Sequence, residues 1–138
     1  NHIYYHVRTL APRDMRYPTV GDWYSKPYMS LMQIFVSPMP DWRAEFCVAI
    51  HEMIEQAICR MDGITAADVD KYDSTHAESS DEPDIPGSPY RRAHFFAYVV
   101  EMMLAKELGL DWTAYGKMLD KAYETTRKAG RRLHKRKK

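Results

Sequence analysis

The first 37 residues contain short runs of β-branched and aromatic side chains, separated by prolines and a glycine. Such runs predict strands, because these side chains suit a pleated and partly buried surface. Three strands are expected, over residues 2–9, 20–24 and 29–37, the third being the most buried. Pro38 and Pro40 follow and end the third strand.

From residue 42 onward the apolar positions recur at helical spacing. Asp41 is a suitable N-cap for the first helix, and Gly63 and Gly109 are suitable stops after the two longest apolar segments. Four helices are predicted, over residues 42–61, 65–72, 90–108 and 111–128. The segment 74–89 is rich in acids and prolines, which indicates a long exposed loop, and in an enzyme it would act as a lid.

The same periodicity predicts which side of each long helix is buried. In helix 42–61 one stripe is apolar and is expected to face the core, with His51 and Glu55 on its rim and Glu52 pointing outwards. Helix 90–108 is apolar nearly all round, so we expect it to be central and largely buried. The stripe of the first helix consists of Phe46, Ile50, Met53, Ile54, Ala57 and Met61.

Strands followed by helices predict an α+β fold, with a small antiparallel or mixed sheet of about three N-terminal strands packed against about four helices. We expect one domain over residues 1–128 and a basic tail over 129–138, frayed after Gly130. The last twelve residues hold eight Lys and Arg and no acid. Without them, 12 basic residues remain against 19 acidic ones, so the body carries a net charge of about −7.

Cys47 and Cys59 are twelve positions apart on one predicted helix, roughly 18 Å along its axis, and cannot form a disulfide with each other. Two unpaired thiols favour a reducing compartment. The longest apolar segment is too short to span a bilayer, and no signal peptide is evident. A cytoplasmic protein without a membrane partner is the expectation, and the pattern leaves the oligomeric state open.

The sequence His51-Glu52-Met53-Ile54-Glu55 suggests chemistry more directly than any other segment. His51 and Glu55 are four residues apart, so both leave the same side of a helix and could bind one divalent ion. Glu52 would then be available as a general base for a water molecule. An ordinary solvated ion pair between His51 and Glu55 is the alternative interpretation.

The second long helix carries further polar groups on one face, namely His94, Tyr98 and Glu101. A carboxylate among apolar neighbours is expensive to bury unless it is paired or bound to an ion. His94 is therefore a candidate third ligand, while Glu101 and Tyr98 could orient the ligands. Asp73, at the start of the acidic loop, is a further candidate of this orienting kind. A purely structural network of these side chains remains the alternative.

The segment 34–59, a strand leading into a helix with His51-Glu52-x-x-Glu55, resembles the core of zincin metallopeptidases. The resemblance implies a metal-dependent hydrolase, or a degenerate relative of one, with Glu52 catalytic. It implies Zn as the metal, Mn or Fe being alternatives, and a small-molecule or peptide substrate. Glu55 stands where that family has its second His. The chain also resembles small uncharacterised proteins of tailed phages, which would place it in the host cytoplasm.

Two other functions are open. Glu52-x-x-Glu55 on one helix resembles the all-helical nucleotide pyrophosphohydrolases of the MazG type, although the Glu-x-x-Asp pair they need on a second helix is absent. A non-enzymatic interaction module is the other alternative. In it the basic tail could contact nucleic acid weakly and without sequence preference, because Lys and Arg neutralise phosphates. The candidate contacts are Arg131, Arg132, Lys135 and Arg136.

Overall fold

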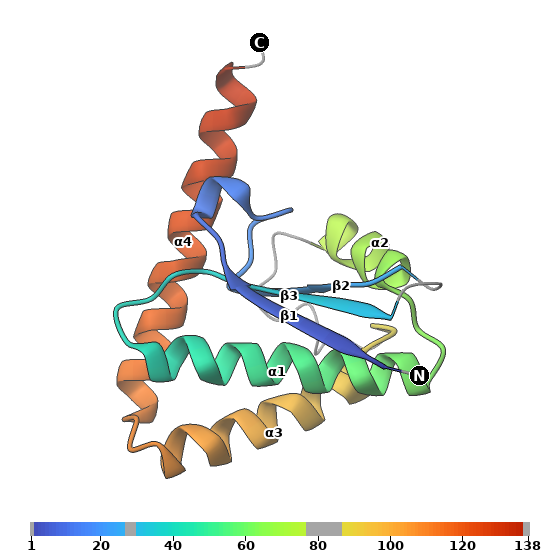
Figure 1. The fold of residues 1–138 in the computed structure, drawn as a ribbon. Helices are drawn as coiled ribbons and strands as arrows, with labels where there is room; N and C mark the ends of the chain where they lie inside the picture. The colour runs from blue at the N-terminus through green and yellow to red at the C-terminus, as the bar shows by residue number, and fades with distance from the viewer. Residues whose placement is uncertain (1, 27–29, 77–86, 137–138) are drawn as a thin grey trace.

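A computed structural model describes residues 2–26, 30–76 and 87–136, without the side chains of residues 76 and 131–136. The fold is a small sheet with helices packed beneath and beside it (Figure 1). The elements are β1 (Tyr4–Thr9), the short 3₁₀ helix η1 (Pro12–Asp14), β2 (Gly21–Tyr24), β3 (Leu31–Val36), α1 (Trp42–Met61), α2 (Ala66–His76), α3 (Arg91–Glu107) and α4 (Trp112–Arg136). The predicted α+β class is confirmed.

The sheet is mixed, with β3 in the centre. β1 pairs with β3 in parallel and β2 pairs with β3 in antiparallel orientation, so that Val7 and Trp23 both lie opposite Ile34. These three side chains point to the same face of the sheet because paired residues share a face. Ile34 is fully buried there. All six residues of β1 are exposed, and β1 forms an open edge.

Local signals define the ends of the long helices. The Asp41 side chain accepts a hydrogen bond from Arg43 N at 2.9 Å and caps α1. At the other end Gly63 has φ 73° and Ile64 N donates to Cys59 O at 2.8 Å, a Schellman arrangement. Gly109, also at φ 73°, ends α3 in the same way. The predicted ends of both helices are therefore confirmed to within a residue.

Two helices are longer than predicted. α2 runs on to His76 rather than ending near residue 72, and the hydroxyl of Ser74 donates to Lys71 O in its last turn. α4 continues to Arg136, so the expected fraying after Gly130 is wrong for the backbone up to that residue. Lys and Arg are good helix formers, and their charge complements the C-terminal end of the helix dipole.

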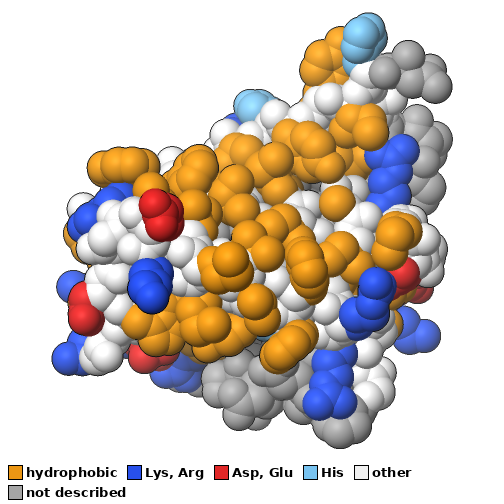
Figure 2. Space-filling model, turned by 90° about the horizontal axis from the view of Figure 1, so that it is seen from below, with side chains coloured by type: hydrophobic (Ala, Val, Ile, Leu, Met, Phe, Trp, Pro, Cys, Tyr) orange, Lys and Arg blue, Asp and Glu red, His pale blue; other side chains and the backbone are white. Residues whose placement is uncertain are grey.

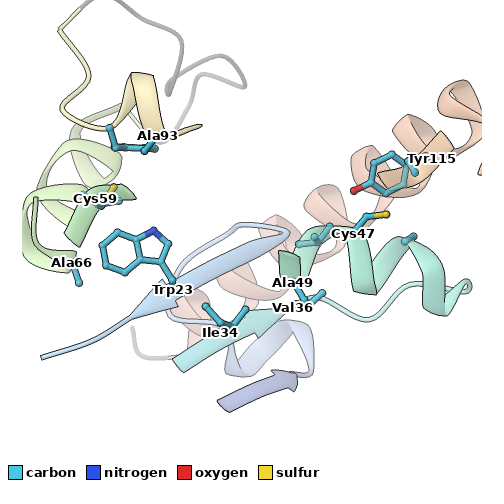
Figure 3. Close-up of a cluster of buried hydrophobic side chains, with 14 of the residues drawn as sticks. Trp23, Ile34, Val36, Cys47, Ala49, Cys59, Ala66, Ala93 and Tyr115 are labelled. Atoms are coloured by element: carbon cyan, nitrogen blue, oxygen red, sulfur yellow. The ribbon is translucent and has the colours of Figure 1, made fainter. Parts of the chain in front are cut away.

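The hydrophobic core lies between the sheet and α1, with contributions from α2, α3 and α4 (Figure 3). Trp23 and Ile34 from the sheet point into it, and Cys47 lies close to Tyr115 of α4. Cys47 and Cys59 are both buried and both free, as predicted. Across the described residues, no helix combines the length and the apolar character needed to span a membrane.

The structure contradicts the predicted orientation of α1. Its inner side carries Cys47 and Val48 together with the buried polar residues His51, Glu52, Glu55 and Gln56. Of the apolar stripe that was expected to face the core, Met53 packs against it, whereas Phe46, Ala57 and Met61 on the other side are exposed. The prediction failed because the sheet and α3 cover the polar side of α1 and leave its apolar side uncovered.

The prediction that α3 is largely buried is wrong in the same way. Small residues and Glu101 form its buried side, whereas Phe95 is 62% and Met103 is 65% exposed. Because α1 and α3 lie side by side beneath the sheet, their uncovered sides form one broad apolar surface (Figure 2). We call this surface the outer face. Its exposed members are Phe46, Ala57 and Met61 of α1 and Phe95, Phe96, Met102 and Met103 of α3.

Candidate metal centre

Three polar side chains meet where α1 and α3 face each other. His51 Nε2 lies 3.3 Å from Glu55 Oε2 and 3.2 Å from His94 Nδ1, and His94 Nδ1 lies 3.0 Å from the same Glu55 oxygen. The three atoms form a nearly equilateral triangle. These are the side chains that the sequence analysis proposed as ligands, and as a group they could hold a metal ion.

Protons alone do not satisfy all three contacts of this triangle. If both imidazoles donate to Glu55, two N–H groups face each other across the contact between His51 and His94. If the N–H of His51 donates to His94 instead, no hydrogen is left for the contact between His51 and Glu55. A cation bound by all three atoms satisfies every contact, because neutral imidazole nitrogens and a carboxylate oxygen then all act as electron-pair donors.

The size of the triangle fits a first-row divalent ion. Ligand bonds of about 2.0–2.1 Å in a tetrahedral zinc site place neighbouring ligand atoms roughly 3.3 Å apart. In an octahedral site with similar bonds the separation is about 3.0 Å, which suits the two-histidine, one-carboxylate set of iron sites. The observed separations of 3.0–3.3 Å span both geometries.

Surrounding side chains hold two of these ligands in place. Trp23 Nε1 donates to Glu55 Oε1 at 3.1 Å, which leaves the other oxygen of Glu55 directed at the imidazoles. Glu101 Oε1 lies 3.1 Å from His51 Nδ1, the ring nitrogen that faces away from the triangle, as an ion pair whose geometry is not that of a hydrogen bond. Carboxylates in this position fix the tautomer of a ligating histidine. Glu101 lies where the role predicted for it from the sequence requires, whereas no pattern in the sequence pointed to Trp23.

The electrostatics of the site follow from burial and close pairing. Burial alone would lower the pKa of His51, but the facing carboxylates of Glu101 and Glu55 raise it well above 6.5. Burial opposes ionisation of Glu55, yet the hydrogen bonds with His51 and His94 lower its pKa to about 2. Without a metal, the triangle is therefore a buried ion pair between a charged imidazole and a carboxylate.

Glu52 lies inside the molecule, and the prediction that it points outwards is wrong. Its side chain is only 9% exposed and lines a cavity of about 90 Å³, together with Glu55 and His94. No hydrogen bond or ion pair to Glu52 is found within the described part of the chain. Burial, followed by the charge of Glu55, raises the pKa of Glu52 well above 4.5.

Gly21 of β2 makes room for the Glu52 carboxylate. A Cβ atom on Gly21 would lie 2.6 Å from Glu52 Oε1 and 2.7 Å from Val48 Cγ1, both closer than van der Waals contact allows. Glycine is thus required by the close approach of α1 to the sheet. The sequence analysis did not identify this requirement, because the two residues are 31 positions apart.

The far wall of the cavity is formed by Asp22 and Asp73 with two tyrosines. Tyr90 donates to Asp73 Oδ1, and Tyr17 donates to Asp73 Oδ2 at 3.1 Å. Arg16 joins Asp22 to Asp70 through bonds of 2.7 and 2.8 Å and ties β2 to α2. Asp73 therefore lies across the cavity from the triangle and does not contact the histidines directly.

The remaining sequence-predicted site residues are not at the triangle. Tyr98 is 40% exposed and its ring lies 5.8 Å from that of Trp112, so the expectation that it orients a ligand is wrong. It lies only about 40° round α3 from His94, but its ring packs beside Trp112 of α4 and not at the triangle. The expected loop 74–89 begins with the last turn of α2, and residues 77–86 lie outside the described residues. The tail contacts, Arg131, Arg132, Lys135 and Arg136, belong to α4, but their side chains also lie outside the description.

Comparisons of this chain with protein-family models, with curated proteins and with solved structures found no match. The resemblance to zincins therefore stays a prediction.

Proposed function

We propose that this protein is a metal-dependent hydrolase that binds zinc through His51, Glu55 and His94. The supporting observation is the triangle of ligand atoms with sides of 3.0–3.3 Å, which protons alone leave unsatisfied. Two imidazoles and one carboxylate are a common catalytic zinc set, in which the fourth position stays open for water. The ion would supply Lewis acidity and lower the pKa of a water molecule at that position.

Glu52 is the general base in this proposal. It is buried, lines the same cavity as Glu55 and His94, and has neither a hydrogen bond nor an ion pair among the residues described. A carboxylate with a raised pKa can take a proton from an attacking water and return it to the leaving group. This is the role that the second residue of a His-Glu-x-x-Glu helix would have.

The cavity limits what can react. At about 90 Å³ it has room for roughly three water molecules, so only the scissile group of a substrate fits beside Glu52. His94 is 23% exposed in its side chain and also lines a wider groove with Arg91, Phe95 and Tyr98. The bulk of a substrate would lie in that groove, where an arginine and aromatic rings are available to an anionic or apolar group.

The experiment is metal titration combined with a turnover assay. Metal-free protein should take up one Zn²⁺ or Co²⁺ per chain, with a cobalt spectrum typical of nitrogen and oxygen ligands. His94→Ala should abolish uptake, whereas His6→Ala, which changes an exposed histidine on β1, should not. Glu52→Gln should keep the metal and reduce turnover of a screened ester, phosphate or peptide substrate by roughly 10²–10⁴-fold.

The metal titration and the turnover assay can fail independently of each other. A folded protein that takes up no metal, or a His94→Ala variant that still does, contradicts the metal site and with it the hydrolase. A stoichiometric metal together with full turnover in Glu52→Gln contradicts only the role of Glu52. Metal uptake without turnover of any substrate in the screen favours the non-enzymatic alternative.

A further inference from the structure

The outer face is unusual for a protein that acts as a monomer. A large side chain can bury roughly 150–250 Å². With this value, the exposed fractions of the three phenylalanines and three methionines of the outer face correspond to an exposed apolar area on the order of 700 Å². The largest apolar patch on a typical monomer is about 300–600 Å². One side of a standard protein interface is about 800 Å². The outer face therefore has the area of half an interface.

The shape of the outer face matches a pair of helices. α1 and α3 run antiparallel, because the start of α3 lies at the end of α1, where Arg92 bonds to Asp62 at 2.9 Å (Figure 1). Helices of 20 and 17 residues give two ridges roughly 25–30 Å long with a groove between them. An identical pair of ridges can pack into such a surface to form a four-helix arrangement.

The charges at the ends of the outer face favour a second copy of this chain. Arg60 is exposed at the end where α1 finishes, next to the ion pair of Arg92 with Asp62, and Glu107 is exposed at the opposite end, beside Lys106. A two-fold axis that lies in the plane of the outer face and crosses the helices at their middle brings the arginine end of one copy against the Glu107 end of the other. An anionic membrane is the competing occupant, and the net charge of +1 on the whole chain gives it no strong general attraction.

We propose that the protein forms a two-fold symmetric homodimer through the outer face. The dimer buries the ridges of α1 and α3, including Phe95 at one edge of the groove beside His94, and leaves the cavity beside Glu52 open, because this cavity lies on the inner side of α1 among Tyr17, Asp22 and Asp73. The dimer does not depend on metal binding. Its failure and that of the proposed hydrolase are therefore separate results.

Analytical ultracentrifugation across the micromolar range tests the dimer. The unaltered chain should sediment as a dimer, and the double variant Phe96→Glu/Met103→Glu should weaken dimerisation on the order of 100-fold or more. The matched control is Tyr4→Glu. Tyr4 is as exposed as Phe95 but lies on the sheet face opposite α1, since the neighbouring Tyr5 is the residue that bonds to Gln56 of α1. This control should remain dimeric.

A second variant keeps the test decisive should the double variant fail to fold. Val99 lies near the middle of α3 on its outward side, and oxidised Val99→Cys protein should form a covalent dimer, whereas Tyr4→Cys protein should not. The native cysteines are buried and do not interfere. A monomeric unaltered chain, or a dimer that survives the double substitution, overturns the proposal. So does a monomer that co-sediments with phosphatidylserine vesicles.

Discussion

The two sides of the α1–α3 pair differ in a way that reverses the usual arrangement of a helical protein. The inner seam, where the two helices face each other, holds His51, Glu55, His94 and Glu101 and is buried. The outer face is apolar and exposed. Buried polar groups need partners and exposed apolar ones need cover, so each side is incomplete without something else. This difference underlies both proposals, an ion held in the inner seam and a second copy of the chain on the outer face.

Breaking the inner seam should have the largest effect on stability. In metal-free protein Glu55→Ala removes the carboxylate that holds the charge of His51 and the N–H of Trp23. The buried charge of His51 then loses one of its two carboxylate partners and the buried N–H of Trp23 loses its acceptor, so the free energy of unfolding should fall by about 3–5 kcal/mol. Urea unfolding of dilute protein measures this loss.

Asp120→Ala is the matched control, because it removes an exposed carboxylate from α4, away from both the inner seam and the outer face. Its effect should stay within about 0.5 kcal/mol. Equal losses in the two variants would show that the seam is not a coupled network.

A smaller effect is expected from Gly21→Ala, which fills the space of the Glu52 carboxylate without touching the triangle. The new methyl group would overlap Glu52 and Val48, so the free energy of unfolding should fall by about 1–3 kcal/mol. Zinc should still bind, while turnover should fall because Glu52 is displaced.

Gly116→Ala should have the opposite effect on stability. A Cβ atom at this helical glycine meets nothing within 4 Å, so alanine should stabilise the protein by about 0.5–1 kcal/mol. Thermal unfolding of both variants checks the pair. An unchanged stability and turnover in Gly21→Ala would mean that Glu52 has more freedom than the structure shows.

The pH dependence of zinc binding tests the charge state of His51 in the inner seam. The pKa of His51 is raised well above 6.5, so zinc must displace a proton from this ring at pH 6.5. Affinity should then rise roughly tenfold per pH unit for each proton displaced, and it should keep rising above pH 6.5. Calorimetry in buffers of different ionisation enthalpy measures the released proton.

Glu101→Gln tests the cause of that dependence. Without the Glu101 charge the pKa of His51 should fall, so the rise of affinity with pH should stop at a lower pH. Affinity itself should drop by roughly 10–100-fold, as is usual when the partner of a ligating histidine is lost. A flat affinity profile in the unaltered protein would show that His51 is neutral before zinc binds.

Part of the candidate site could be predicted from sequence because its members lie on regular helices. His51 and Glu55 are one turn apart, and the helical repeat alone places them on one side of α1. His94 was a candidate because a histidine and Glu101 occur on one face of an otherwise apolar helix. Trp23 and Asp73 could not be assigned in this way. A buried indole needs a partner for its N–H, but only the packing of β2 on α1 decides that the partner is Glu55.

The sequence by itself determined where the helices begin and end and the order of strands and helices. Asp41, Gly63 and Gly109 act on the backbone within a few residues, so their effect needs no tertiary context. Only the tertiary structure decided which side of α1 is inside. Periodicity shows that a helix has a polar and an apolar side, but an apolar side can face a core or a partner. The sheet and α3 pack on the polar side of α1, and this packing forms both the candidate metal centre and the outer face.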